Sequence, residues 1–135
     1  MFKNPKSKIQ NPNQSLNPKS KNKYEFDLLE RTAKFGENII KFAKSLPENT
    51  VNRPLINQIV RSGTSIGANY MEADAAESKK DFRHKVGISK KESKESMHWL
   101  RMISVANENK KDDCRKLWKE AHEFVLMFSS MLRNK

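Results

Sequence analysis

The stretch that decides the fold is RSGTSIGANYMEADAAESKKDF, residues 61–82. Its apolar and small residues recur every three or four positions, which predicts a helix with one buried face. Gly63 and Gly67 interrupt this helix, although glycine inside a helix costs about 1 kcal/mol relative to alanine. Because they are four residues apart, the two glycines lie one above the other on the same face. We interpret them as positions where a neighbouring helix comes too close for a side chain.

The same stretch also contains the start of the next helix. Ser78 and Asp81 have the spacing of a capping box, in which the hydroxyl accepts from the backbone N–H three residues on and the carboxylate reaches back. Phe82 then begins an apolar and small stripe that continues through the following helix at positions 86, 89, 93, 96, 100 and 103. Three of these positions are serines, so we expect the glycines to face the serine stripe and the two backbones to lie close together.

Two more helices are expected on either side of this pair. The first begins at Tyr24 and ends at Leu46-Pro47, with a stripe at positions 26, 29, 33, 36, 40 and 43. Asn52 is expected to cap the second helix, whose stripe is 55, 59, 62, 66, 69 and 73. The fourth follows the polar segment 107–111 and has its stripe at 117, 121, 124, 128 and 131. No segment alternates as a strand does, so residues 24–135 are predicted to form an all-α, antiparallel, up-down four-helix bundle.

Composition narrows the class of protein. The chain has 135 residues, with 27 Lys and Arg against 16 Asp and Glu, for a net charge of +11. Such a chain is attracted to polyanions, with nucleic acid as the first candidate. The single cysteine excludes an intrachain disulfide, and no apolar run approaches the roughly 18 residues of a membrane span. We therefore expect a cytoplasmic protein with no membrane association.

Residues 1–23 have a different composition from the rest of the chain. They are rich in Asn, Pro, Lys and Ser, with lysines at positions 3, 6, 8, 19, 21 and 23 and no acid. This composition predicts a disordered basic tail. The sequence leaves open whether the tail is an electrostatic arm for nucleic acid or only a solvated leader.

The third helix carries the strongest candidate for a binding surface. Its basic residues are Lys79, Lys80, Arg83, Lys85, Lys90, Lys91 and Lys94, with His84 among them. Four of them, at positions 80, 83, 90 and 94, follow one side of a helix and are suited to contacting phosphates along a nucleic acid. The alternative is a solvated face that Glu92 and Glu95 balance. No aromatic residues are interleaved with these lysines, so stacking of single-stranded bases is not predicted.

The sequence gives no sign of catalysis, a metal or a cofactor. It contains neither a phosphate-binding glycine loop nor a nucleophile elbow. The three histidines and Cys114 lack the close ligand pairs of structural zinc sites, so a metal site is not expected. Arg61 is instead predicted to form interhelical ion pairs with Glu72, Glu92 or Glu95.

The region from Arg61 to Ile103 closely resembles the bacterial four helix bundle protein family. This family includes proteins encoded by intervening sequences in 23S ribosomal RNA genes, and it is similar to the accessory variability protein of diversity-generating retroelements. The matching elements are Arg61-Ser62, Ser65-Ile66, Asn69, Glu72-Ala73, the run from Glu77 to Phe82, Lys91-Glu92, Glu95 and Trp99-Leu100. The resemblance implies a helical bundle without known catalytic activity. For the retroelement relatives it implies a basic homopentamer that binds RNA and a reverse transcriptase.

Together, these features predict a non-enzymatic bundle that self-associates and binds nucleic acid, RNA rather than DNA, in the manner of an accessory to a reverse transcriptase. The alternative is a structural or adaptor bundle with a protein partner and no nucleic-acid role, and a metal-dependent enzyme is the third reading. Self-association is expected because the serine and glycine stripes bury little apolar area. We expect apolar surface to remain at Phe35, Phe42, Trp99, Trp118 and Met127.

Overall fold

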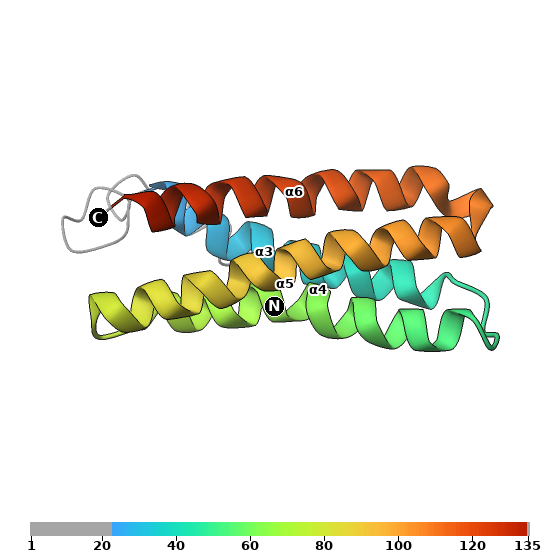
Figure 1. Cartoon of the computed structure of the whole chain (residues 1–135), viewed down its shortest axis with the longest axis horizontal. Coiled ribbons are helices and arrows are strands. Elements are labelled where there is room, and N and C mark those ends of the chain that lie inside the picture. The colour runs from blue at the N-terminus through green and yellow to red at the C-terminus, as the bar shows by residue number, and fades with distance from the viewer. Residues whose placement is uncertain (1–22, 135) are drawn as a thin grey trace.

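The computed structural model describes residues 23–134. Within this range the chain forms α3 (Lys23–Lys44), α4 (Asn52–Asp74), α5 (Lys79–Ala106), the short 3-10 helix η1 (Glu108–Lys110) and α6 (Lys111–Arg133). The helices lie side by side along the long axis of the molecule, and successive helices run in opposite directions (Figure 1). The predicted all-α four-helix bundle is confirmed. The tail expected at residues 1–23 lies outside the described residues, apart from Lys23, which is already helical.

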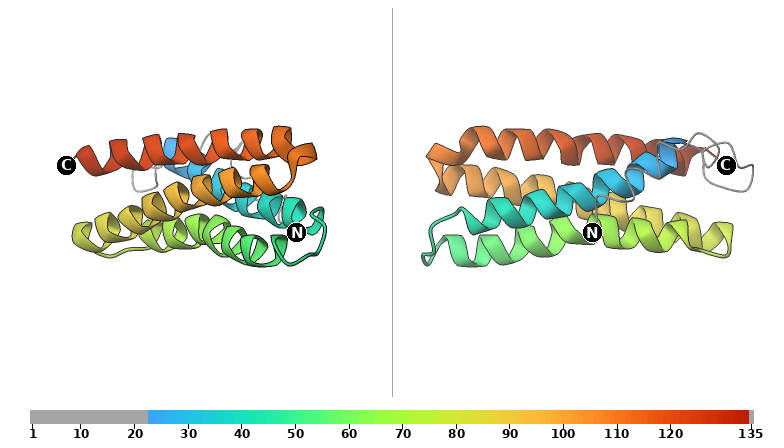
Figure 2. Two further views of the ribbon diagram at one scale, coloured as in Figure 1. Left: turned by 45° about the vertical axis from the view of Figure 1, so that its right-hand side comes forward. Right: turned by 180° about the vertical axis from the view of Figure 1, so that it is seen from behind.

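The bundle is packed unevenly around its axis. Helices α4, α5 and α6 run alongside one another, whereas α3 crosses the bundle obliquely (Figure 2). Helix α3 begins beside the C-terminal part of α6 and ends beside the start of α4 (Figure 2). Helix α3 meets α6 near its middle, where the Phe35 and Phe124 rings lie edge to face with centroids 5.5 Å apart.

The helix starts show one prediction confirmed and one wrong. Ser78 caps α5, because its hydroxyl accepts from the backbone N–H of Asp81 at 3.0 Å. The expected cap of α4 by Asn52 is wrong: Asn49 Oδ1 accepts from the N–H of Asn52 at 2.7 Å, and the Asn49 carbonyl accepts from Arg53. The capping side chain therefore lies at Asn49, three residues before the position that the sequence predicted.

Asn52 instead closes the end of the bundle. It is buried, and its side-chain amide pairs reciprocally with Asn107 through bonds of 3.0 and 2.9 Å. Asn52 also donates to the carbonyl of Pro47, and Asn107 donates to that of Ile103. Buried amides require hydrogen-bond partners, and this pair provides them. The pair also connects the α3–α4 loop to the end of α5.

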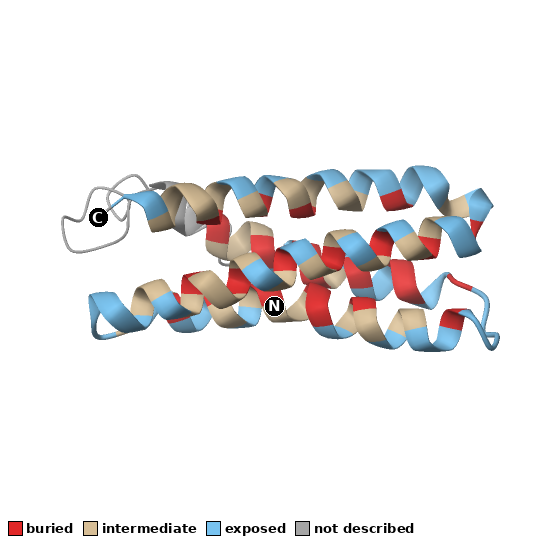
Figure 3. Cartoon of the chain, in the orientation of Figure 1, coloured by how far each residue is buried: buried red, intermediate tan, exposed pale blue. Residues whose placement is uncertain are grey.

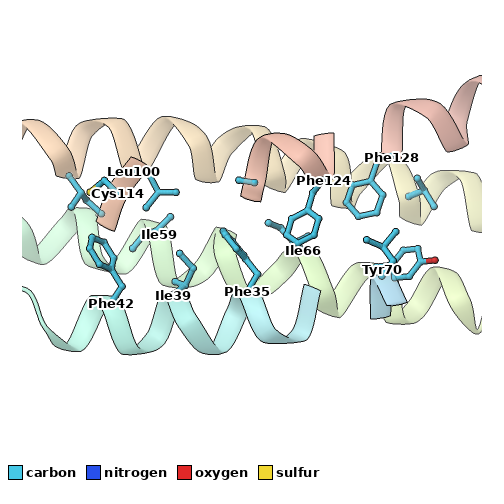
Figure 4. Packing of buried hydrophobic residues seen from close by; sticks show 14 of the residues in the cluster. Phe35, Ile39, Phe42, Ile59, Ile66, Tyr70, Leu100, Cys114, Phe124 and Phe128 are labelled. Carbon is cyan, nitrogen blue, oxygen red and sulfur yellow. The ribbon is translucent and has the colours of Figure 1, made fainter. Parts of the chain in front are cut away.

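The core confirms the stripes predicted for α4, α5 and α6. Their centres are buried at Ile59 and Ile66 on α4, Val86 and Leu100 on α5, and Phe124 on α6. Buried positions line the sides of the helices that face the interior (Figure 3), and large side chains from all four helices meet there (Figure 4). Tyr70, which was not part of the stripe predicted for α4, is also buried and packs against Phe128.

The stripe predicted for α3 is partly wrong. The buried positions of this helix and its end are Leu28, Thr32, Phe35, Gly36, Ile39, Phe42, Ala43 and Leu46. Of the predicted stripe, Gly36 and Ala43 are buried, whereas Ala33 and Ile40 are exposed. Phe35 and Phe42 were expected at the surface but belong to the core, because the oblique path of α3 turns that side of the helix toward α6 and α4.

The glycines allow close approach, but to a different helix from the expected one. A Cβ atom on Gly63 would lie 2.9 Å from Ile39 Cγ1, and one on Gly67 would lie 3.2 Å from the carbonyl oxygen of Thr32. Both neighbours belong to α3, so the glycines serve the α3–α4 contact and not the α4–α5 contact. The reason is their position on α4, one residue beyond Ser62 and Ile66, which rotates them away from α5.

Serines, rather than glycines, bring α4 and α5 together. The hydroxyl of Ser96 donates to that of Ser62 at 2.9 Å, and Ser89 donates to the carbonyl oxygen of Ile66 at 3.1 Å. Ser93 donates to the carbonyl of Ser89 on its own helix. Because every one of these hydroxyls is buried and bonded, small polar side chains form this part of the core without an unsatisfied group.

Within residues 23–134, no helix combines the length and the apolarity that crossing a bilayer requires.

Candidate nucleic-acid interface

The flank of α5 that faces α4 is neutralised by ion pairs. Arg61 contacts Glu95 at 2.6 Å and Glu92 at 3.4 Å, as the sequence predicted in part. Lys85 contacts Glu72 at 2.7 Å. The carboxylates of Glu92 and Glu95 are therefore bound by Arg61 of α4, and Glu95 also lies close enough to Lys91 to interact with its charge.

The pKa values of the paired groups follow from these contacts. The hydrogen bond to Glu95 raises the pKa of Arg61, and that to Glu72 raises the pKa of Lys85. Burial by itself would raise the pKa of Glu95, but hydrogen bonds from Trp99 and Arg61 and the charges of Arg61 and Lys91 together lower it. Glu95 is therefore ionised throughout the neutral range, and its pairing with Arg61 weakens only as the pH falls below the ordinary range of a glutamate.

The remaining cations of α5 form no close ion pairs with the acids whose side chains the structure describes, although Arg83 donates to the backbone carbonyl of Asn134 at 3.4 Å and Lys91 interacts with the charge of Glu95. Six of the seven predicted phosphate-binding residues make no salt bridge to any residue in the range 28–134. They are Lys79, Lys80, Arg83, Lys90, Lys91 and Lys94. The seventh, Lys85, is held by Glu72 on the α4 side. Separation of charge across this helix leaves one flank near neutrality and the other strongly positive.

A shallow groove of about 490 Å³ runs along the positive flank. We call it the basic groove. Its lining residues are Lys80, Arg83, His84, Gly87, Ile88, Lys91 and Leu132. Gly87 provides the hollow, because a Cβ atom placed there would have nothing within 4 Å. The cationic side chains stand around this hollow, and Leu132 from the last turn of α6 forms its other wall.

The basic groove includes only part of the predicted set. Lys80, Arg83 and Lys91 line it, whereas Lys79, Lys90 and Lys94 lie on the same helix outside the lining. Lys90 and Lys94 continue the positive flank, since they follow Arg83 and Lys91 by seven and three residues. Gly87 was not predicted as a site residue, although a glycine inside a helix indicates a missing side chain and therefore a hollow. It also missed Leu132, for which no signal exists in the sequence.

The described residues offer little for other chemistry. No group of three or more His, Cys, Asp or Glu side chains in the range 23–134 is arranged to hold a metal ion. His84 lies in the basic groove, His98 contacts Trp99, and His122 on α6 stacks on Trp118. Cationic and apolar surfaces are therefore the features of this part of the chain with which a partner could interact.

Comparison with known proteins agrees with this architecture. A family model described as 23S rRNA-intervening sequence protein matches residues 24–130. The chain is also similar to the crystal structure of a protein of unknown function from the S23 ribosomal protein family of Bacteroides thetaiotaomicron VPI-5482, with 29% identity and a TM-score of 0.70. That similarity covers 79% of this chain and 99% of the other. No curated protein matches the sequence. Because the family model spans most of its length, the chain belongs to the 23S rRNA-intervening sequence protein family.

Proposed function

We propose that this protein is a non-enzymatic bundle that binds RNA through the basic groove of α5. The observation that carries the proposal is the division of charge on α5. Its acids at positions 92 and 95 are bound by Arg61, whereas the cations around the groove make no salt bridge within residues 28–134. Cations around a hollow that make no salt bridge are suited to phosphate oxygens, because contact with phosphate releases counterions without first breaking a close ion pair.

The geometry favours recognition of the backbone over reading of the sequence. A single helix face with lysines and one arginine contacts phosphates along a strand but presents few groups to base edges. The groove is wide and shallow, so it suits a backbone running along α5 better than a base held in a pocket. We therefore expect affinity for structured RNA that depends strongly on salt and weakly on sequence.

Charge removal inside the groove tests this proposal. The variant Lys80→Gln, Arg83→Gln, Lys91→Gln should bind labelled structured RNA more weakly at every salt concentration. Each lost phosphate contact lowers the slope of log K against log salt by about 0.7 to 0.9, so the slope should decrease by about 2 to 2.7. Fluorescence anisotropy titrations at several salt concentrations measure this change, and circular dichroism checks that the bundle is intact.

A matched control separates the groove from the overall charge. The variant Lys34→Gln, Lys41→Gln, Lys44→Gln removes the same number of charges from exposed positions on α3. It should lose much less affinity than the groove variant. Equal losses in the two variants would assign the binding to net charge alone, and wild-type protein that does not bind RNA at low salt would refute the proposal.

We also propose that the protein acts as a homo-oligomer, through an apolar groove between α3 and α4. This groove has a volume of about 500 Å³ and is lined by Leu29, Thr32, Ala33, Gly36, Glu37, Ile40, Thr64, Gly67, Ala68, Met71 and Asp74. Ile40 and Met71 are 45% and 60% exposed there. Helix α3 thus has a second apolar stripe in addition to its buried one, and a second copy of the chain would cover it.

Substitutions in this groove should dissociate the oligomer. Ile40→Glu with Met71→Glu is expected to bring the mass in light scattering close to the 15.7 kDa of one chain, because buried unpaired carboxylates are strongly unfavourable. Val105→Glu, at an exposed position at the end of α5, should leave the oligomer intact. A wild-type protein that is monomeric at tens of micromolar would contradict self-association. It would leave the groove to a partner of another kind, such as the reverse transcriptase that the family resemblance implies.

A further inference from the structure

An open cleft lies between α5 and α6 at the end of the bundle where η1 joins them. Its volume is about 260 Å³, slightly below the usual range for small-molecule sites. The lining residues are Leu100, Arg101, Ser104, Lys111, Cys114, Arg115 and Trp118. The cleft thus combines an aromatic ring, three cations and an apolar base, a combination that the basic groove lacks.

Trp118 is held in a fixed orientation at the cleft. It stacks on His122 with ring centroids 5.3 Å apart and an angle of 25° between the planes. His122 is not among the residues that line the cleft, so the histidine supports one part of the indole and the cleft borders another. The indole is half-buried. Stacking of a nucleobase requires an aromatic ring that is supported by a neighbouring side chain and still accessible.

The charged residues of the cleft remain available to a phosphate. Arg101 and Lys111 make no salt bridge to any residue between 28 and 134, and Arg115 contacts Asp112 at 3.0 Å on the preceding turn of α6. Leu100 and Cys114 are buried beneath them. Burial, together with the charge of Asp113, raises the pKa of the Cys114 thiol to about 11, so the base of the cleft is uncharged at neutral pH.

The cleft also continues the positive flank of α5. Arg101 follows Lys94 by seven residues, and Lys94 follows Lys91 by three, so these residues share one side of the helix. At 1.5 Å per residue, the path from Lys80 to Arg101 is about 30 Å long. An RNA strand whose phosphates run along the basic groove would therefore reach the cleft at the end of the helix.

From this arrangement we propose that the cleft binds one unpaired nucleotide of an RNA, with the base stacked on Trp118 and a phosphate held by Arg101 and Lys111. The inference rests on the proposed binding of RNA to the basic groove and adds to it a preference for RNA with an unpaired end or loop. Base stacking could not be predicted from the sequence, because Trp118 and Arg101 are on different helices and only the turn at η1 brings them together.

The test compares an oligouridylate of about ten nucleotides, within the range that single-strand sites occupy, with a blunt RNA duplex of the same length. Trp118→Leu should weaken binding of the single strand by about 5- to 150-fold, the range expected for loss of one stacked base. It should leave duplex binding unchanged, because a blunt duplex offers no unpaired base. Trp118→Phe should retain most of the affinity, and Arg101→Gln should lose part of it.

A second measurement needs no change at the proposed platform. In the variant Trp99→Phe, Trp118 is the remaining tryptophan. The single strand should quench its fluorescence, and the duplex should not. The inference is overturned if the single strand binds without quenching, or if Trp118→Leu weakens single-strand and duplex binding equally. In either case, binding of RNA to the basic groove would still be tested separately by the salt titrations of the groove variant. Failure of the wild-type protein to bind either RNA would instead refute the proposed function.

Discussion

Replacing Gly63 with leucine is expected to destabilise the bundle by about 3 kcal/mol or more, at the upper end of the usual cost of overpacking. A Cβ atom at this position would already lie 2.9 Å from Cγ1 and 3.1 Å from Cγ2 of Ile39. Ile39 is fully buried and cannot move aside without displacing the core around it. The rest of the leucine side chain would then separate α3 from α4. Urea unfolding followed by circular dichroism measures the loss.

Gly87 provides the matched control. It lies in the middle of α5, and a Cβ atom there would meet no atom within 4 Å. Gly87→Ala should therefore stabilise the protein by up to about 1 kcal/mol through helix propensity alone, whereas Gly63→Ala should destabilise it. Shortening the neighbour with Ile39→Val should recover part of the loss in Gly63→Ala, which a double-mutant cycle would detect. Equal effects of alanine at the two glycines would show that close packing is not the reason for Gly63.

Much of the fold follows directly from the sequence. The number of helices, the break at Leu46-Pro47 and the cap at Ser78 were all predicted, because proline and an N-terminal serine act through local backbone geometry. The stripes of α4, α5 and α6 were also predicted, since each of these helices has one dominant run of apolar or small residues with helical spacing.

The register of α3 could not be obtained in the same way. This helix has pairs of adjacent apolar residues, such as Leu28 with Leu29 and Ile39 with Ile40. Two parallel stripes fit the helical period equally well, so periodicity alone does not decide between them. The choice is made by tertiary packing: Ile39 fills the space that Gly63 leaves on α4, and Ile40 remains at the surface.

The candidate site shows the same limit. The lysines of α5 and the pairing of Arg61 with Glu92 and Glu95 could be predicted from the sequence, but the pairing of Lys85 could not. Glu72, which was a candidate partner of Arg61, binds Lys85 instead. Helical spacing places these groups on α5, whereas only the position of α4 decides which charges are neutralised. For the same reason Leu132, from the last turn of α6, was absent from the predicted surface.

Phe124→Ala is expected to cost about 3 to 5 kcal/mol, a large part of the stability of a domain of this size. Phe124 is fully buried and lies at the place where α3 meets α6. Its ring contacts Phe35 at 5.5 Å, Phe128 at 6.3 Å and the guanidinium of Arg31 at 5.5 Å. Alanine at this position would leave a cavity in the row of aromatic side chains between α3 and α6 (Figure 4).

Two controls identify the origin of this stabilisation. Leu126→Ala removes a large side chain that is 52% exposed on the same helix and should change stability by less than about 0.5 kcal/mol. Glu120→Gln removes the 2.7 Å ion pair with Arg31, the main charged link between α3 and α6, and should cost less than about 1 kcal/mol because both side chains are partly solvated. If Glu120→Gln destabilised the protein as much as Phe124→Ala in urea unfolding, α3 would be held mainly by charge. The smaller loss expected for Glu120→Gln would instead show that the aromatic contact, and not this ion pair, is the stronger link between α3 and α6.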